Sequence, residues 1–203
     1  MKNVIVVDYG MGNLRSINKK LHNFNIKSKI SENLEDIENA DYLILPGVGN
    51  FKQAINNLKS YGIYSILNQK VMKEKTPIFG ICLGMQLLMD SSEEFGYFKG
   101  LSLIPGTVKK ISKNSKIILP NIGYYKLNIN NRSPLKKCSK YWYYFIHSFH
   151  CIPREKSDIE STISFNKKII VSSVSKENIH GCQFHPERSS DGGIEFYKTF
   201  LNE

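Results

Sequence analysis

The sequence predicts an α/β fold in which a mostly parallel, twisted sheet is flanked by helices and extended by antiparallel strands. Two observations carry this prediction. Short apolar runs of strand length alternate with amphipathic stretches of helical period in the first half of the chain, which is the rhythm of βαβ units. The stretch from about 106 to 165 holds more turn residues and less helical pattern, so we expect the antiparallel additions there.

The expected strands are short runs that contain β-branched or aromatic residues. They cover residues 4–7, 42–45, 78–81, 142–146, 169–174 and 179–184. Apolar residues recur at helical spacing between the early runs. The expected helices cover residues 14–24, 54–58, 63–72 and 85–89, with a closing helix after Gly192-Gly193.

Length and composition favour one compact unit. At 203 residues with 41% hydrophobic content, the chain can bury a core without metals or disulfides, so residues 1–203 are expected to form a single domain. No apolar run approaches the roughly 20 residues that span a bilayer, so no membrane association or export is expected. The four cysteines form no CxxC pair, which argues against a disulfide framework and fits a reducing cytoplasm.

The chain is basic, with 28 Lys and Arg against 18 Asp and Glu and a formal charge of +10. Such a balance is found in nucleic-acid-binding proteins. Here only four of the basic residues are arginine and the lysines are scattered. This distribution favours a solvated, lysine-rich surface over a nucleic-acid site, and it leaves an acidic protein partner open.

The sharpest local feature is a cysteine between two glycines, at Gly80-Ile81-Cys82-Leu83-Gly84. It lies where the expected strand 78–81 meets the expected helix 85–89. Glycines on both sides of a nucleophile allow the sharp turn that exposes its side chain. The amino terminus of the following helix would favour a thiolate and an oxyanion. A buried structural cysteine between turn glycines is the competing interpretation of this motif alone.

A histidine and a glutamate follow the expected strand 179–184, as His185-Pro186-Glu187. In an extended segment, residues two apart face the same way, so Glu187 is expected to reach one ring nitrogen of His185 while the other faces a nucleophile. Pro186 is expected to keep this segment out of a helix. Together with Cys82, the pair forms a nucleophile, a base and an orienting group.

Two further features fit the same chemistry. Segment 46–49, with the letters PGVG, directly follows the expected strand 42–45, and its glycines let backbone amides point at a developing negative charge. A plain strand-to-helix turn is the competing interpretation. Gln86 lies one helical turn beyond Cys82, on the side of the helix that faces the nucleophile, where it can pair with a substrate amide or carboxylate.

These segments resemble those of the class I glutamine amidotransferases. Segment 80–86 (GICLGMQ) is similar to the nucleophile motif of that family, and segment 185–187 (HPE) to its base and orienting residue. Other segments resemble one branch, the glutaminase subunit of imidazole glycerol phosphate synthase. They are 8–14 (DYGMGNL), 46–49 (PGVG), 144–148 (YFIHS) and 183–189 (QFHPERS). The resemblance runs over nearly the whole chain and implies the flavodoxin-like fold of this family.

The resemblance also implies the role of each residue. Cys82, His185 and Glu187 would form the catalytic triad that hydrolyses L-glutamine to glutamate and ammonia, with no cofactor and no metal. The remaining implied residues fall into three groups: an oxyanion group of Val48, Gly49 and Leu83, a substrate group of Gln86, His147, Ser148 and Phe149, and a partner interface of Asn13, Tyr144 and Arg188.

The implied partner is a (β/α)8 cyclase or synthase subunit that forms a heterodimer with this chain. It would receive the ammonia through an internal channel and make imidazole glycerol phosphate and AICAR in histidine biosynthesis. One departure concerns segment 120–124, which has PNIGY where the family typically has Pro-His-Met-Gly-Trp. This leaves open a paralogous glutaminase that supplies ammonia to a sugar amidotransferase of surface-polysaccharide biosynthesis.

Two functions of other classes are weighed against this one. The first is a cysteine hydrolase of the α/β-hydrolase type, which the close spacing of His185 and Glu187 argues against, because the acidic residue of that type normally precedes the histidine. The second is a non-catalytic partner or metal-binding module. Its candidate ligands are His147, His150, Cys151, His180 and Cys182, whose spacing is unlike that of a zinc site.

Overall fold

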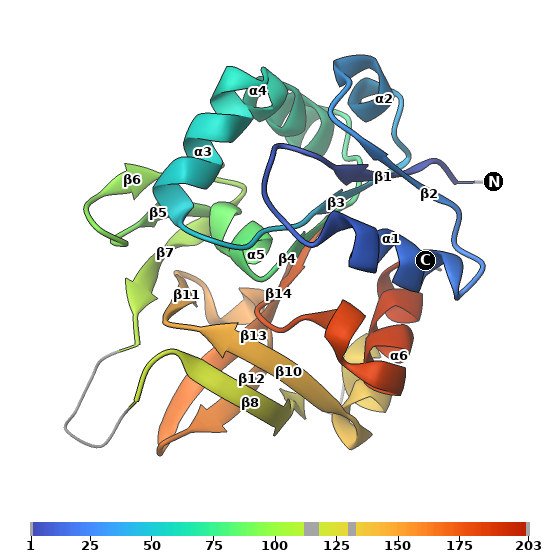
Figure 1. Cartoon of the computed structure of the whole chain (residues 1–203). Coiled ribbons are helices and arrows are strands. Elements are labelled where there is room, and N and C mark those ends of the chain that lie inside the picture. Colours follow the sequence, from blue (N-terminus) through green and yellow to red (C-terminus); the bar gives the residue numbers. More distant parts are fainter. Residues whose placement is uncertain (1, 112–117, 130–132, 202–203) are drawn as a thin grey trace.

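An eight-stranded sheet forms the centre of the protein in the computed structural model, which describes residues 2–111, 118–129 and 133–201 (Figure 1). The strand order is β2-β1-β3-β4-β14-β13-β12-β9. Pairings from β2 to β14 are parallel, and those from β14 to β9 are antiparallel. The bounds are β1 Val4–Val7, β2 Ser28–Ser31, β3 Tyr42–Leu45, β4 Ile78–Ile81, β9 Asn128–Ile129, β12 Ile159–Phe165, β13 Lys168–Lys176 and β14 Ile179–Cys182.

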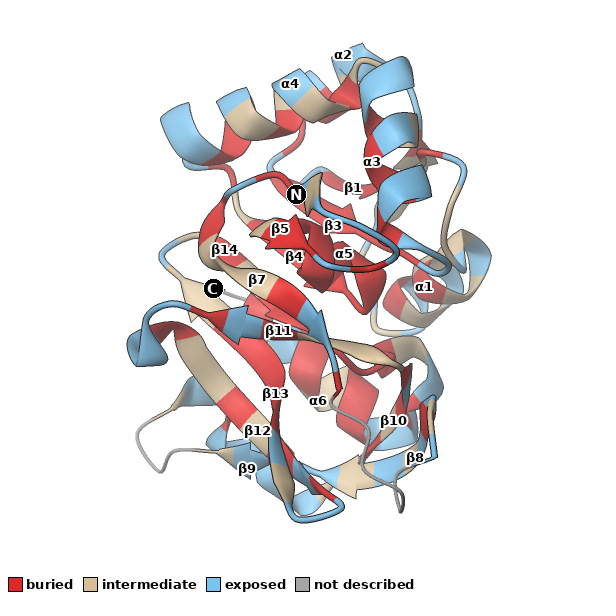
Figure 2. Cartoon of the chain, turned by 90° about the vertical axis from the view of Figure 1, so that its left-hand side faces the viewer, coloured by how far each residue is buried: buried red, intermediate tan, exposed pale blue. Residues whose placement is uncertain are grey.

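Both faces of the parallel half are covered by helices, as the alternation of side chains along a strand requires. In β1, Ile5 and Val7 belong to one apolar cluster, while Val4 and Val6 belong to the other. The first cluster packs under α2, α3, α4 and α5, and the second under α1 and α6. Their bounds are α1 Leu14–His22, α2 Leu34–Glu38, α3 Phe51–Ser60, α4 Ile63–Asn68, α5 Leu83–Leu87 and α6 Ser190–Leu201. Figure 2 shows buried strands at the centre and exposed outer helix faces.

The antiparallel additions fill the expected stretch 106–165, of which residues 112–117 and 130–132 are outside the described residues. They also extend beyond it, from residue 89 at one end to the end of β13 at residue 176 at the other. A second sheet has the order β11-β7-β5-β6, and β8 pairs with β10 as a two-stranded ribbon. The bounds are β5 Met89–Ser92, β6 Phe98–Lys99, β7 Ile104–Lys110, β8 Asn121–Lys126, β10 Trp142–His147 and β11 Phe149–Pro153. The described residues also form three short 3-10 helices: η2 Pro134–Lys140 between β9 and β10, η3 Lys156–Asp158 between β11 and β12, and η4 Pro186–Arg188 between β14 and α6.

Several expected boundaries were wrong. The stretch 63–72 is α4 followed by a π-helical turn, η1 Gln69–Lys73, and the stretch 85–89 is the end of α5 followed by the start of β5. The closing helix α6 begins at Ser190, before the glycine pair rather than after it. The reason is packing: a Cβ on Gly193 would lie 1.8 Å from the carbonyl oxygen of Pro186, so glycine lets the first turn of α6 lie directly against η4.

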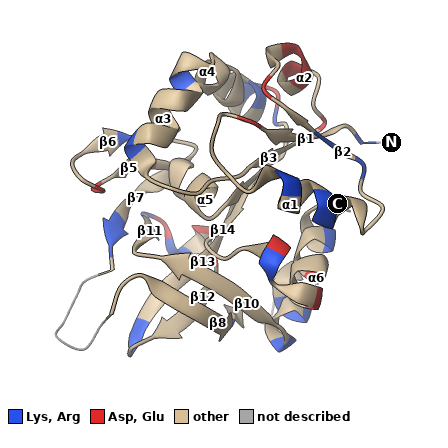
Figure 3. Ribbon diagram, viewed as in Figure 1, with Lys and Arg blue, Asp and Glu red and all other residues tan. Residues whose placement is uncertain are grey.

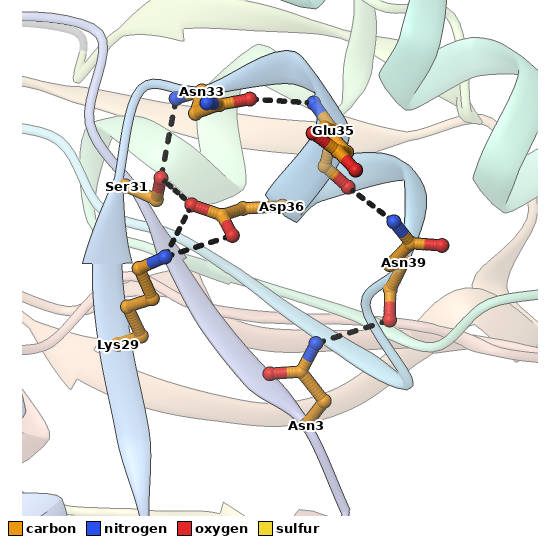
Figure 4. A network of polar contacts seen from close by, with 7 residues as sticks. All are labelled: Asn3, Lys29, Ser31, Asn33, Glu35, Asp36 and Asn39. Carbon is orange, nitrogen blue, oxygen red and sulfur yellow. Dashed lines mark hydrogen bonds and ion pairs between the residues drawn. The ribbon is translucent and has the colours of Figure 1, made fainter.

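The elements β2 and α2 were not predicted, because both are largely polar. Side-chain hydrogen bonds hold them together at one edge of the sheet (Figure 4). Asp36 accepts from Lys29, with Nζ 2.8 Å from Oδ1, and from the hydroxyl of Ser31. Asn33 caps α2 by accepting from the backbone N–H of Glu35 at 2.8 Å, which satisfies one of the free amides of the first turn.

Basic residues do not gather on one element. In Figure 3 they are spread over α1, β2, the α3–α4 pair, β7 and the last helix. Among the described residues, no helix is both long enough and apolar enough to cross a membrane.

The sheet topology brings three chain segments to one place. Strands β3, β4 and β14 are adjacent and parallel, with Leu45 opposite Gly80 and Ile81 opposite Cys182. Their carboxyl ends therefore lie at the same edge of the sheet, where ligands bind in open α/β folds. The segments that follow these ends are 46–49, Cys82 with α5, and His185 with η4.

Candidate active site

Cys82 sits at a sharp turn between β4 and α5. Its φ is +54° and its ψ is −107°, a conformation that L residues adopt rarely. Glycine is required on both sides of Cys82, because neighbouring backbone atoms leave no room for a Cβ at residues 80 and 84. A Cβ on Gly80 would lie 2.7 Å from the backbone of Gly84, and a Cβ on Gly84 would lie 1.9 Å from the carbonyl oxygen of Leu45. The turn thus presents the Cys82 side chain above the end of the sheet, as predicted for a nucleophile elbow.

The helix behind Cys82 is short and begins two residues earlier than expected. Helix α5 covers only Leu83–Leu87, so its dipole is small and its contribution at Cys82 comes from the first backbone amides. The turn itself is held by two backbone bonds: Cys82 N donates to Cys182 O at 2.7 Å, and Gln86 N donates to Cys82 O at 3.2 Å. The nucleophile candidate is thereby tied to both neighbouring elements.

His185 and Glu187 interact as predicted, but not in an extended segment. His185 Nδ1 lies 2.8 Å from Glu187 Oε1, and the two side chains are 6% and 1% exposed. Pro186 opens the 3-10 helix η4, where its missing N–H and fixed φ are compatible with a first helical position. The expectation that Pro186 excludes a helix was therefore wrong. A tight turn, rather than strand alternation, brings the carboxylate onto the ring.

The environment of His185 favours its charged form. Burial alone would favour the neutral ring, but hydrogen bonding and charge interaction with Cys82 and Glu187 raise the pKa of His185 to about 10. Because a carboxylate only accepts, Nδ1–H is the donor to Glu187. The other nitrogen, Nε2, is then left for Cys82 and for a bound molecule.

The loop 46–49 lies against the elbow. Tyr9 Oη donates to Pro46 O at 2.6 Å, and a Cβ on Gly47 would lie 2.7 Å from the amide nitrogen of Gly84. Gly49 has φ +103°, which favours glycine. No hydrogen bond within the described part of the chain occupies the backbone N–H groups of Val48 and Gly49. These two amides are therefore without a partner among the described residues.

These features surround one pocket of about 320 Å³. Its lining includes every predicted site residue except Tyr144, namely Asn13, Val48, Gly49, Cys82, Leu83, Gln86, His147, Ser148, Phe149, His185, Glu187 and Arg188. Tyr144 lies just outside it: its ring is 4.1 Å from the guanidinium carbon of Arg188, and its carbonyl accepts from His185 N at 2.9 Å.

Two lining residues were missed, Glu94 and Ile146. Glu94 is 9% exposed, and its Oε2 accepts from Phe51 N at 2.7 Å, at the start of α3. Burial raises the pKa of Glu94. In the sequence, Glu93-Glu94 resembles an ordinary solvated pair, and no local signal distinguishes the second glutamate from the first.

Gln86 and His147 contact the same backbone oxygen. Gln86 Nε2 lies 3.1 Å and His147 Nδ1 lies 2.8 Å from Phe149 O. Asn121 Nδ2 lies 3.0 Å from His147 Nε2, and Tyr125 Oη donates to Asn121 Oδ1 at 2.7 Å. Burial lowers the pKa of His147 to about 4. The ring is therefore neutral near pH 7, with Nδ1–H as donor and Nε2 as acceptor.

Three of the candidate metal ligands of the competing hypothesis have other partners. Cys151 Sγ donates to Met85 O, Cys182 Sγ to Phe184 O, and His180 Nδ1 pairs with the hydroxyl of Ser175. Within the ranges that the structure describes, no three His, Cys, Asp or Glu side chains gather in a metal-binding arrangement.

Comparison with known proteins adds independent findings. The family model of glutamine amidotransferase class-I matches residues 5–203. The imidazole glycerol phosphate synthase subunit HisH of Prochlorococcus marinus is 42% identical over 201 residues, covering 98% of this chain and 93% of the relative. The HisH 2 subunit of Methanococcus maripaludis is 40% identical, covering 98% and 99%.

The fold is shared with solved structures as well. A crystal structure of a glutamine amidotransferase superposes with a TM-score of 0.75, at 19% identity and over 98% of both chains. At this identity the likeness concerns the fold alone. The sequence matches carry the family assignment: this chain belongs to the class-I glutamine amidotransferases, in the group of imidazole glycerol phosphate synthase HisH subunits.

Proposed function

We propose that this chain hydrolyses L-glutamine to L-glutamate and ammonia, with Cys82 as nucleophile, and supplies the ammonia to a synthase subunit that makes imidazole glycerol phosphate and AICAR in histidine biosynthesis. The observation that carries this proposal is the pocket in which Cys82, the His185–Glu187 pair and the 46–49 loop meet. The relatives are named as subunits of imidazole glycerol phosphate synthase, which supports the proposal that this synthase receives the ammonia.

In the first half-reaction, the Cys82 thiolate attacks the side-chain carbonyl carbon of glutamine. A carbon–sulfur bond forms, and the carbonyl oxygen takes the negative charge, which the amides of Val48, Gly49 and Leu83 stabilise. His185 donates its proton to the amide nitrogen as the carbon–nitrogen bond breaks, and ammonia leaves. The raised pKa of His185 supports this role, because it keeps the proton on the ring until the leaving group needs it.

In the second half-reaction, water replaces the leaving group. Neutral His185 takes a proton from the water, whose oxygen attacks the thioester carbon. Collapse of the second oxyanion breaks the carbon–sulfur bond, releases glutamate and restores the thiolate. Glu187 keeps Nδ1–H in place throughout and stabilises the charged ring.

The pocket suits the rest of the substrate. The Glu94 carboxylate is a negative group in the pocket lining and would pair with the α-ammonium of glutamine. The backbone around Ser148 and Phe149, together with Gln86, would hold the amino-acid portion. Burial of Glu94 lowers the local dielectric, which strengthens such a charged hydrogen bond.

The partner is proposed to be a (β/α)8 subunit that binds over the mouth of the pocket. One face of the β8–β10 ribbon is apolar and exposed, with Ile122, Tyr124, Trp142 and Ile146 between 38% and 56% accessible. Val48 adds a fifth exposed apolar side chain beside it. An exposed apolar face at an active-site mouth is typical of a surface that another protein covers. Asn13, Tyr144 and Arg188 border this face.

The sugar-amidotransferase alternative is not favoured. Relatives named for imidazole glycerol phosphate synthase match 98% of the chain. The departure at Asn121 also has a local explanation, since this side chain is buried and hydrogen-bonded to His147 and Tyr125. Asn121 thus belongs to the support of the pocket, whereas Ile122 and Tyr124 of the same segment lie on the exposed face proposed for the partner.

The proposal is tested by co-purifying the chain with candidate synthase subunits and measuring glutamate release and product formation. We expect the isolated chain to hydrolyse glutamine slowly and the correct complex to hydrolyse it much faster, because a partner would reorient the amides of the 46–49 loop. In the complex, Cys82→Ala should abolish glutamine-dependent synthesis and leave ammonia-dependent synthesis intact. Residual glutaminase activity in that variant would refute the role of Cys82, and full activity of the isolated chain would refute the role of the partner.

A further inference from the structure

A buried amide outside the predicted triad lies next to the nucleophile. Gln183, directly after β14, is fully buried, and its Nε2 lies 3.6 Å from Cys82 Sγ. This is within the range of an N–H···S hydrogen bond. The backbone N–H of Gln183 donates to Ser172 O at 2.9 Å. The backbone of the residue is thus held by the sheet, and its side chain contacts Cys82.

The direction of this hydrogen bond is determined by its neighbours. Gln86 Nε2 lies 3.1 Å from Phe149 O and 3.1 Å from Gln183 Oε1. A backbone carbonyl can only accept, so the group of Gln86 that faces Phe149 is the NH₂. Its second hydrogen then points at Gln183, whose nearer atom must be the oxygen. The amide nitrogen of Gln183 is thereby turned toward Cys82.

The carbonyl of Phe149 is itself held in place. His147 Nδ1–H donates to the same oxygen, and the ring is fixed by Asn121 and Tyr125 on β8. Reversal of the Gln86 amide would place its oxygen against the Phe149 oxygen and would leave two acceptors face to face. The low dielectric of a buried site makes such a contact costly. The chain of amides therefore presents a donor to the sulfur.

We propose that Gln183 stabilises the Cys82 thiolate by this hydrogen bond and that Gln86 acts as a positioning residue that holds the Gln183 amide in the donating orientation. A thiolate accepts a hydrogen bond more strongly than a thiol, so the bond favours the reactive form. The inference rests on the proposed role of Cys82 as nucleophile. It also narrows the role of Gln86, because both of its amide hydrogens are used inside the protein and only its oxygen is left for a substrate.

The test is the pH profile of Cys82 alkylation by iodoacetamide, followed by mass spectrometry. Cys82 is the most exposed of the four cysteines, at 7%, and the other three are fully buried. Gln183→Met keeps the length of the side chain and removes the donor. We expect the midpoint of the alkylation profile to move up by about one pH unit, with a roughly tenfold lower rate below the midpoint.

Gln86→Met should move the profile in the same direction by a smaller amount, because Gln183 loses the group that orients it. In the Gln183→Met background, the Gln86 substitution should have no further effect on alkylation, since its influence passes through Gln183. Ser161→Ala is the matched control: Ser161 is a buried hydroxyl in the same sheet that bonds Ser172 and Ser173. It should lower thermal stability without moving the profile.

An unchanged alkylation profile in folded Gln183→Met would overturn the inference. If that variant does not fold, the wild-type protein still decides the question by NMR: the side-chain amide of Gln183 should titrate with the alkylation midpoint, and a resonance that does not titrate would contradict the bond. Glutamine turnover is measured in parallel. If Gln183→Met shifts the alkylation profile but the wild-type chain shows no glutaminase activity in complex with its partner, the proposed function is refuted and the hydrogen bond is still established.

Discussion

Single charged and polar side chains give this pocket its chemical character. Apart from the triad and Arg188 at its rim, the one charged side chain in the pocket lining is Glu94 among the described residues. The backbone N–H of Phe51, at the start of α3, donates to one oxygen of Glu94, and the other oxygen remains for a ligand. A carboxylate in this position selects for a cationic group on the substrate.

Glu94→Gln should raise the KM for glutamine about tenfold or more and change kcat little. The amide oxygen still accepts from Phe51 N, so the loop stays in place, but the negative charge is lost. A hydrogen bond between charged groups contributes ~1.5–3 kcal/mol, which corresponds to this range. Steady-state kinetics of the complex measure the effect.

Glu93→Gln provides the control for charge alone. Glu93 is half-exposed, and its Oε1 lies 2.9 Å from Lys109 Nζ. This change should leave both constants near those of the wild type, because an exposed pair contributes little. Equal effects of the two substitutions would argue that Glu94 acts through general charge and makes no contact with the substrate.

At the scale of elements, strand ends and glycine contacts shape the site. The carboxyl ends of β3, β4 and β14 meet, and glycines at Gly47, Gly80 and Gly84 let the segments after β3 and β4 touch. Strands with continuous apolar runs were predicted correctly, as β1, β3 and β4 show. The partly exposed β2, with the sequence SKIS, was missed because a strand at the edge of a sheet needs no apolar run.

Gly84→Ala should destabilise the protein by about 3 kcal/mol and displace the 46–49 loop. The added Cβ would lie 1.9 Å from Leu45 O and 3.2 Å from Pro46 O, so backbone must move, which is more costly than a rotamer change. Urea denaturation gives the free energy of unfolding. Glutaminase activity of the folded fraction should also fall, because the loop carries the proposed oxyanion amides.

Gly123→Ala on β8 is the matched substitution. Its added Cβ would meet only the Tyr125 side chain, at 3.3 Å, and a side chain can adjust. We expect a loss below about 1 kcal/mol there. If both variants lost the same stability, the close contact between the elbow and β3 would not be the cause.

At the scale of the whole molecule, stability depends on pH through buried histidines. Burial lowers the pKa of His147 to about 4, so the folded protein resists protonation of this ring while the unfolded chain takes up a proton near pH 6.5. Stability contributed by the neutral ring is complete above pH 6.5 and falls as the pH drops toward 4. His185 affects stability in a different pH range, because its pKa is raised in the folded protein. The stability contributed by its charged ring is complete below pH 6.5 and is lost as the pH rises through about 10.

The wild-type protein should be less stable at pH 5 than at pH 7, and His147→Asn should reduce this difference by about 2 kcal/mol. The figure follows from about 1.36 kcal/mol for each pH unit between 6.5 and 5. Asparagine retains an amide N–H near the position of Nδ1 and does not titrate. Urea unfolding at both pH values measures the difference. The same substitution at the exposed His22 is the control, and an unchanged difference in the His147 variant would show that this ring does not drive acid unfolding.

The sequence by itself determined the fold class and the residue types of the site, because periodicity and local motifs depend on neighbouring residues. Cys82 between glycines and His185 beside Glu187 are such motifs. Only the tertiary structure decided how they meet. The pairing of β14 with β4 brings the two motifs together, and Glu94 and Gln183 acquire their surroundings from elements distant in the chain. The physical reason is that burial and the direction of hydrogen bonds are set by strand register and packing, which no local pattern contains.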